Sequence, residues 1–359
     1  MSPYPDSSPG LHKLSVEMEL MYSQYVMPSE HLLDVARAMA EAAVAYLAAL
    51  TPHQRELSLF PFEETHRTLW EFEPLGAGNP RYGVPWPDLT SHQQQLLREL
   101  LRTGLGDQGL VKAETIREVE TIQHPDQGTR SYSVWFYGAP SLERPWTWRF
   151  EGHHLSATFT ICGGEISNTP LFVGVSPTCV HDNTDNPDVP VGTRAMPVEE
   201  DTSRALWESL DEAQRELCSI PLPDMMMRTP HVDRVERLPP QGIRVDALRP
   251  EQREWVHRLM RTFMGNVAPP LATRRYEEWV SAGQDELWLS AARANIRSEP
   301  WGHARPDGYY YRLQGPTFLI EFDDVQWGWQ DTGHIHSMWR DYEDDFGFRL
   351  LRSYNTRMR

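Results

Sequence analysis

The pattern that most restricts the fold of this chain is a pair of stretches dense in aromatic and β-branched residues, each interrupted by glycine and proline. The first stretch covers residues 131–161 and the second covers residues 308–322. Such stretches are typical of short β-strands joined by tight turns. Strands joined by a tight turn pair antiparallel. We therefore expect an antiparallel sheet built from two hairpins.

Helical patterns precede and separate these hairpins. Ser29 and Thr90 are polar residues of the kind that cap a helix, and strong helix formers follow each of them. A glycine-rich break begins at Gly104. We expect helices over residues 30–50, from residue 52, over 91–103, from there to 122, and over 199–217, 250–263, 274–282 and 341–353. Helices packed on an antiparallel sheet make an α+β fold.

The chain is expected to form one large domain. Residues 1–28 predict a flexible N-terminal arm, and residues 29–359 predict a single α+β domain. Inside this domain the sequence echoes itself, because "YSVWFYGAP" with "WTWRFEGHH" parallels "YYYRLQGP" with "TFLIEFDDV". The echo leaves open an internal duplication into two helix-plus-hairpin halves.

Charge excludes two classes of partner. The sequence has 34 lysines and arginines against 51 aspartates and glutamates, which gives a formal net charge of −17. Nucleic-acid backbones and anionic membranes both bind basic surfaces. We therefore expect neither as a partner, and we expect a small-molecule substrate instead.

Cysteines and apolar runs indicate the compartment. The three cysteines are scattered and form neither a disulfide framework nor a zinc-binding CxxC pair. The most apolar run, residues 32–50, contains Asp34, Arg37 and Glu41, so it predicts a helix of a folded domain and not a membrane span. Residues 1–10 lack the pattern of a secretory signal. These features predict a cytoplasmic protein.

Two histidine clusters are the candidate site. His153 and His154 lie inside the first strand stretch, and His334 and His336 follow the second. Residues two apart in an extended segment point to the same side, so His334 and His336 can reach one point. The apolar alternation changes phase at Gly152, which predicts a β-bulge and favours His154 as a metal ligand with His153 in support.

Charged residues accompany both clusters. Glu321 and Asp323 share one face of their predicted strand, while Arg340 and Asp341 follow the second histidine pair. Imidazoles with carboxylates bind divalent ions such as Zn, Fe or Cu, and we favour Zn. Glu321, Asp323 or Asp341 would then act as a base or fourth ligand, and Arg340 would hold an anionic group.

The sequence thus predicts a metal-dependent enzyme that acts on a small polar molecule, with hydrolysis favoured. A mononuclear Fe or Cu oxygenase or oxidase at the same ligands is the first alternative. The second is a metal- or ligand-binding module without catalysis, in which the histidines are structural. Sequence motifs for nucleotide binding, zinc proteases and serine hydrolases are absent.

Several segments resemble a known family, the one labelled domain of unknown function 3500. The resemblance is carried by "FEGHHLSATFT" with "TPLFVG", by "GPTFLIEFDDVQ" and most specifically by "GHIHSMWRDYEDDFG". It extends from about residue 30 to the end of the chain, and the chain departs from the family pattern over residues 176–193. The resemblance implies one domain over most of the chain and implies no activity.

Overall fold

The computed structural model describes residues 30–78, 80–223, 227–229, 231–293 and 304–357. The arm expected over residues 1–28 lies outside these residues, and the domain boundary stays a prediction. Most helices begin where expected, but the two helices expected on either side of Gly104 form one helix with a kink at Gly106, and the helix expected over 199–217 is divided into two. The described helices are α2 (Glu30–Ala49), α3 (Pro52–Ser58), α4 (Ser91–Gln123), α5 (Pro197–Ser209), α6 (Glu212–Cys218), α7 (Pro250–Met264), α8 (Pro269–Gly283) and α9 (Phe348–Arg357).

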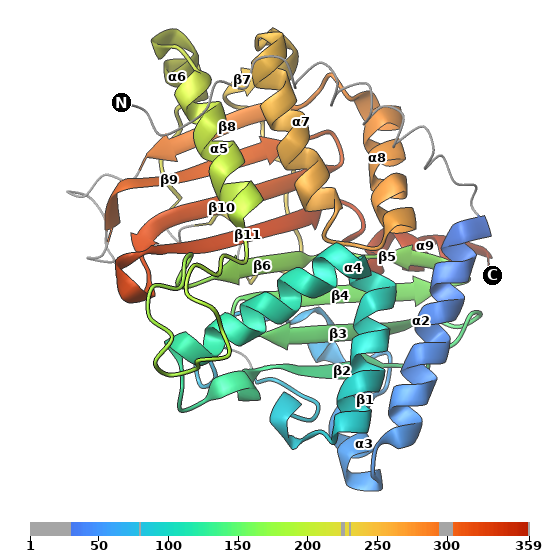
Figure 1. Cartoon of the computed structure of the whole chain (residues 1–359). Helices are drawn as coiled ribbons and strands as arrows, with labels where there is room; N and C mark the ends of the chain where they lie inside the picture. Colours follow the sequence, from blue (N-terminus) through green and yellow to red (C-terminus); the bar gives the residue numbers. More distant parts are fainter. Residues whose placement is uncertain (1–29, 79, 224–226, 230, 294–303, 358–359) are drawn as a thin grey trace.

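One sheet of eleven strands crosses the described part of the chain (Figure 1). The strands are β1 (Leu59–Phe60), β2 (Ser133–Tyr137), β3 (Trp146–Gly152), β4 (Leu155–Cys162), β5 (Glu165–Ser167), β6 (Leu171–Val175), β7 (Ile243–Arg244), β8 (Trp288–Arg293), β9 (Ala304–Gln314), β10 (Phe318–Trp327) and β11 (Gly333–Asp341). Their order is β1-β2-β3-β4-β6-β11-β10-β9-β8-β7, with β5 paired to β4. All of these pairs are antiparallel except β1 with β2.

The α+β class is therefore confirmed, whereas a sheet of only two hairpins is not. The expected final helix over 341–353 begins later, at Phe348, because Asp341 still belongs to β11 and a turn follows it. None of the described helices combines the length and the apolar character that crossing a bilayer requires.

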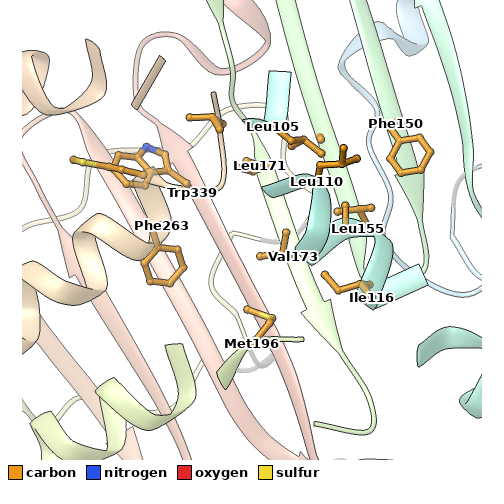
Figure 2. Packing of buried hydrophobic residues seen from close by; sticks show 14 of the residues in the cluster. Leu105, Leu110, Ile116, Phe150, Leu155, Leu171, Val173, Met196, Phe263 and Trp339 are labelled. Atoms are coloured by element: carbon orange, nitrogen blue, oxygen red, sulfur yellow. The ribbon is translucent and has the colours of Figure 1, made fainter. Parts of the chain in front are cut away.

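One face of the sheet packs against the helices and forms the apolar core. Figure 1 shows α2 and α4 over the strands β2 to β6, and α5, α7 and α8 over the strands β8 to β11. In Figure 2, Leu110 and Ile116 of α4 lie beside Leu155 of β4, and Phe263 of α7 lies between the sheet halves near Trp339. Burial of this apolar face supplies the main driving force for the fold.

The opposite face, called the polar face below, is buried although it carries charges. Its inward residues include Arg149, Glu321 and Arg340, each almost fully excluded from solvent. Two loop segments cover it, the first with residues 61–78 and 80–84 and the second with residues 227–229 and 231–241. Arg149 donates to the carbonyls of the first segment, and Arg340 donates to those of the second. The charges are tolerated because these bonds replace water.

One pair of contacts recurs in the first and the second half of the described chain. Gln93, near the start of α4, donates to the last carbonyl of α2 and to the side chain of Gln54, over 2.9 Å each. Gln252, near the start of α7, donates to the last carbonyl of α5 and to the side chain of Gln214, over 2.8 and 2.9 Å. The halves meet where β6 pairs with β11.

Candidate metal centre

Three histidines from distant parts of the chain converge at the edge of the polar face. One nitrogen of each of His154, His334 and His336 lies within 4.8 Å of the others. Nε2 of His154 is 2.8 Å from Nε2 of His334, although 180 residues separate them. His154 and His336 are buried, and His334 remains partly exposed. The geometry therefore brings three imidazole nitrogens close to one point, and His334 is the least buried of the three residues.

His154 reaches this point from a tight turn. The expected bulge at Gly152 is wrong, because Gly152 pairs with Leu155 and His153 and His154 form the connection between β3 and β4. His154 has a φ of 64°, a left-handed conformation that costs a non-glycine residue about 1–2 kcal/mol. Its backbone N–H donates to Phe72, and its carbonyl accepts from Gly174. These bonds hold the turn in its strained conformation.

His334 and His336 lie within β11 and not after the last strand. They project toward the polar face, and β11 runs between β10 and β6. Gly174 of β6 leaves room for the cluster, since a Cβ there would lie 2.6 Å from the Ile335 carbonyl oxygen and 3.2 Å from Cδ2 of His154. Glycine at this position therefore lets the imidazole of His154 approach β11.

The pKa values of His154 and His334 keep both imidazoles in the neutral form. Burial lowers the pKa of His154 and of His334 well below 6.5, and the neighbouring imidazoles lower it further. Both rings are therefore neutral at pH 7, which is the form that binds metal ions. Burial alone would lower the pKa of His336, but the carboxylates of Asp323, Glu73 and Asp324 together outweigh it and raise the pKa.

Asp323 orients His336. Its carboxylate oxygens lie 3.2 and 3.3 Å from Nδ1 of His336. An N–H on Nδ1 that donates to the carboxylate leaves the lone pair on Nε2, and such a carboxylate is the usual partner of a metal-binding histidine. The predicted acid is thus present at the site, in contact with a ligand candidate.

His153 points away from this cluster, toward α4. Its Nδ1 lies 2.8 Å from Oε2 of Glu120, and its ring stacks on His154 with a centroid distance of 3.8 Å. Burial raises the pKa of Glu120 to about 8 and lowers the pKa of His153 well below 6.5. At pH 7 the two residues therefore share a hydrogen bond between neutral groups. Glu120, His153 and His154 form a second group whose ligand atoms lie within 4.8 Å of one another.

Two of the predicted site residues, Glu321 and Arg340, have other partners than the histidines. Glu321 accepts bonds from Arg228, Thr229 and Tyr310, so it anchors a covering loop. Arg340 pairs with Asp345 over 2.6 Å and donates to two carbonyls.

Asp341 ends β11. Seven residues of extended strand put it roughly 23 Å from His334. Asp341 therefore lies far from the imidazoles, while the side chains of Glu321 and Arg340 bind other partners.

The structure also adds residues that the sequence did not indicate. Phe72 stacks between Phe172 and His231, with centroid distances of 3.9 and 4.6 Å. Glu73 lies 3.9 Å from His231, is partly exposed, and contributes to the raised pKa of His336. These residues come from the covering loops, where no strand or helix period reveals which side chains face inward. The covering loops therefore bring a carboxylate close enough to His336 to raise its pKa.

The spacing of the ligand atoms nearly suits a metal ion. Ligands 2.0–2.1 Å from a tetrahedral zinc ion lie about 3.4 Å apart. The two Nε2 atoms at 2.8 Å would have to separate by about half an ångström. The three imidazoles, one oriented by Asp323, therefore fit a divalent ion with three protein ligands after a small shift.

The chain was also compared with known proteins. A family model described as "Protein of unknown function (DUF3500)" matches residues 34–348, nearly the whole chain. No curated protein and no solved structure gives a significant match.

Proposed function

Because the chain belongs to the DUF3500 family, which is described as of unknown function, we propose a function from the site alone. His154, His334 and His336 bind a divalent metal ion, with Zn favoured, and the protein is a metal-dependent hydrolase of a small polar molecule. The observation that carries this proposal is the convergence of three imidazole nitrogens within 4.8 Å.

The arrangement supports catalysis more than a purely structural metal. Structural zinc sites are closed by four protein ligands, whereas catalytic sites keep a position open. Three histidines converge here, and His334 is partly exposed. A core of this size also does not require a metal ion to fold.

Residues near the three histidines can act as a base or position a ligand in the proposed reaction. A divalent ion bound here would polarise a substrate carbonyl or phosphoryl group and lower the pKa of water. Glu73, whose side chain is 40% exposed and whose charge raises the pKa of His336, is the proposed acceptor of a proton from water. Asp323 holds His336 in position, and Phe72 with Phe172 forms an apolar wall beside it. Glu73 therefore replaces Glu321 and Asp341 as the proposed base.

Metal analysis of the purified full chain tests the proposal. We expect about one zinc per chain, no visible or EPR signature, and loss of the metal in His336→Ala. His257→Gln is the control, because His257 is a partly buried histidine of α7 outside the cluster. Stoichiometric Fe or Cu with oxygen-dependent turnover would favour the oxygenase alternative. A folded protein that binds no divalent ion would leave the histidines structural.

A further inference from the structure

The C-terminal end of α4 carries a group of buried side-chain atoms without partners. Four such atoms, each with a lone pair, have no hydrogen-bond partner among the described residues: Oε1 of Glu120, Oε1 of Gln123, Nε2 of His124 and Oε1 of Gln127. The residues are three or four positions apart, so they follow one side of the helix and of the turn after it. Buried acceptors rarely lack a partner. One water molecule donates only two hydrogen bonds, whereas a cation attracts lone pairs from every side.

Glu120 is the acidic member of this group. Its side chain is 2% exposed, and its Oε2 lies 2.8 Å from Nδ1 of His153. Arg81 acts on the carboxylate through its charge, but no described lysine or arginine forms an ion pair with it. The last turn of α4 also has no basic residue, so the partial negative charge at its C-terminus is not compensated. Both features favour a bound cation.

Glu120 and His153 have the spacing of two neighbouring ligands of one ion. Adjacent ligands of an octahedral ion with bonds of 2.0–2.1 Å lie about 2.8–3.0 Å apart. The 2.8 Å between Oε2 of Glu120 and Nδ1 of His153 therefore needs no adjustment. His124 follows Glu120 by four positions, and its ring centroid lies 5.2 Å from that of His153. Two ligands four positions apart on a helix are a recurrent arrangement in metal sites.

This group adjoins the three-histidine site. The ring of His153 stacks on that of His154, and the ligand atoms of Glu120, His153 and His154 lie within 4.8 Å of one another. Nε2 of His154 faces His334 in the three-histidine site. Ions bound by the two groups would be neighbours, because His154 belongs to both.

We propose that Glu120, His153 and His124 bind a second divalent cation, of the kind that prefers octahedral coordination, such as Mn²⁺. The ion replaces the proton that Glu120 and His153 share, and this proton leaves to solvent. Because that hydrogen bond must break, the second ion binds more weakly than the zinc ion and is taken up on titration. These ligands differ from those of the zinc ion, so only the pairing of the two ions rests on the proposed function. With both ions bound, the protein has a two-metal centre, which can hold a substrate between two cations.

Titration of the full chain with Mn²⁺ tests the proposal. The chain is first saturated with zinc and freed of excess metal, and the EPR signal of free Mn²⁺ then measures how much of the added ion is bound. We expect one Mn²⁺ per chain in addition to the zinc, without release of zinc. A chain that binds Mn²⁺ but no zinc would contradict the proposed function and still support this second site. No bound Mn²⁺, or Mn²⁺ that binds only as zinc leaves, would overturn the second site.

Variants locate the ion. Glu120→Gln keeps the shape of the side chain and removes its charge, so it should weaken Mn²⁺ binding at least tenfold while one zinc stays bound. Glu118→Gln changes an exposed glutamate of the same helix, and this matched control should leave binding unchanged. His336→Ala should lose zinc and keep Mn²⁺.

His124→Gln provides a test that does not depend on the fold of Glu120→Gln, because His124 lies beyond the last turn of α4 and is only partly buried. It should also weaken Mn²⁺ binding at least tenfold, with circular dichroism as the check on folding. Unchanged Mn²⁺ binding in folded Glu120→Gln or in His124→Gln, or its loss in His336→Ala, would place the ion elsewhere and overturn the proposal.

Discussion

The carboxylate of Asp323 lies 3.2 Å from Nδ1 of His336, and the two residues are directly paired across β10 and β11. Both side chains project toward the polar face, because paired residues of adjacent strands point the same way. The register of two strands therefore fixes the orientation of this imidazole. No loop has to close to place it.

Asp323→Asn should weaken zinc binding by about 10- to 100-fold, since the loss of a carboxylate behind a metal-binding histidine has effects of this size. The variant should remain folded, because asparagine keeps the shape of the side chain. Competition with a chromogenic chelator measures the affinity. Asp331→Asn, an exposed substitution nearby in sequence, is the control and should leave the affinity unchanged. Equal affinities for wild type and Asp323→Asn would contradict the assigned role.

His154→Asn separates the backbone role of this residue from its ligand role. Asparagine adopts left-handed backbone conformations more readily than most residues, so the turn with φ of 64° should persist. We expect a folded protein with an unchanged melting temperature in the absence of metal, and loss of stoichiometric metal. His154→Ala should lose the metal as well and also unfold more easily. Retention of a full metal equivalent by His154→Asn would exclude His154 as a ligand.

Gly174→Ala should disturb the site without removing a ligand. The added Cβ would lie 2.6 Å from the Ile335 carbonyl oxygen, so β6 and β11 must shift apart. We expect a lower melting temperature and weaker zinc binding together, measured by calorimetry and chelator competition. A destabilised variant with unchanged zinc affinity would show that the spacing of β6 and β11 does not control the cluster.

The raised pKa of Asp341 makes the free energy of unfolding depend on pH. Its pKa is 3.8 ordinarily and about 7 in the fold, mainly because of burial. The folded state thus prefers the protonated carboxyl, and stability falls as the pH rises from about 4 to 7 and then levels off.

Asp341→Asn cannot ionise and keeps an oxygen for the two backbone N–H groups. It should exceed the wild type in unfolding free energy at pH 8, by up to about 4 kcal/mol. At pH 4 the difference should disappear. Denaturant titrations at both pH values measure it, and a difference that is the same at both would assign the effect to packing and not to charge.

The sequence predicts the helices well and the sheet only in part. Thr90 and Pro250 mark helix starts that depend on residues close in sequence, and these helices appear where expected. β11 was missed, since its histidines, serine and arginine conceal the alternation of Ile335 and its neighbours. Those polar residues are buried only because covering loops from elsewhere in the chain supply their hydrogen bonds. Such partners cannot be identified from local pattern.

The candidate site, like the sheet, is predicted by the sequence only in part. The His-x-His spacing indicates two ligands on one side of a strand, and the structure brings His154 to them. The turn at His153 was not recognised, because turns with a left-handed residue are usually marked by glycine or asparagine. Asp341 was grouped with the histidines by its nearness in sequence, but an extended strand carries residues apart by about 3.3 Å each. Glu73 comes from a loop without any spacing signal, and Glu120 comes from a predicted helix whose period does not show that one of its buried residues is a glutamate facing His153.

The pairing of β6 with β11 makes this chain resemble a dimer whose two subunits are tethered. The first half contributes β6, the second contributes β11, and the connection between them includes exposed residues near Asp185. A tether of this kind raises the effective concentration of one half for the other. Two polypeptides divided at Asp185 should therefore reassemble through this strand pair, and His154 on one would meet His334 and His336 on the other. Metal binding would then report on the complementation of the fragments.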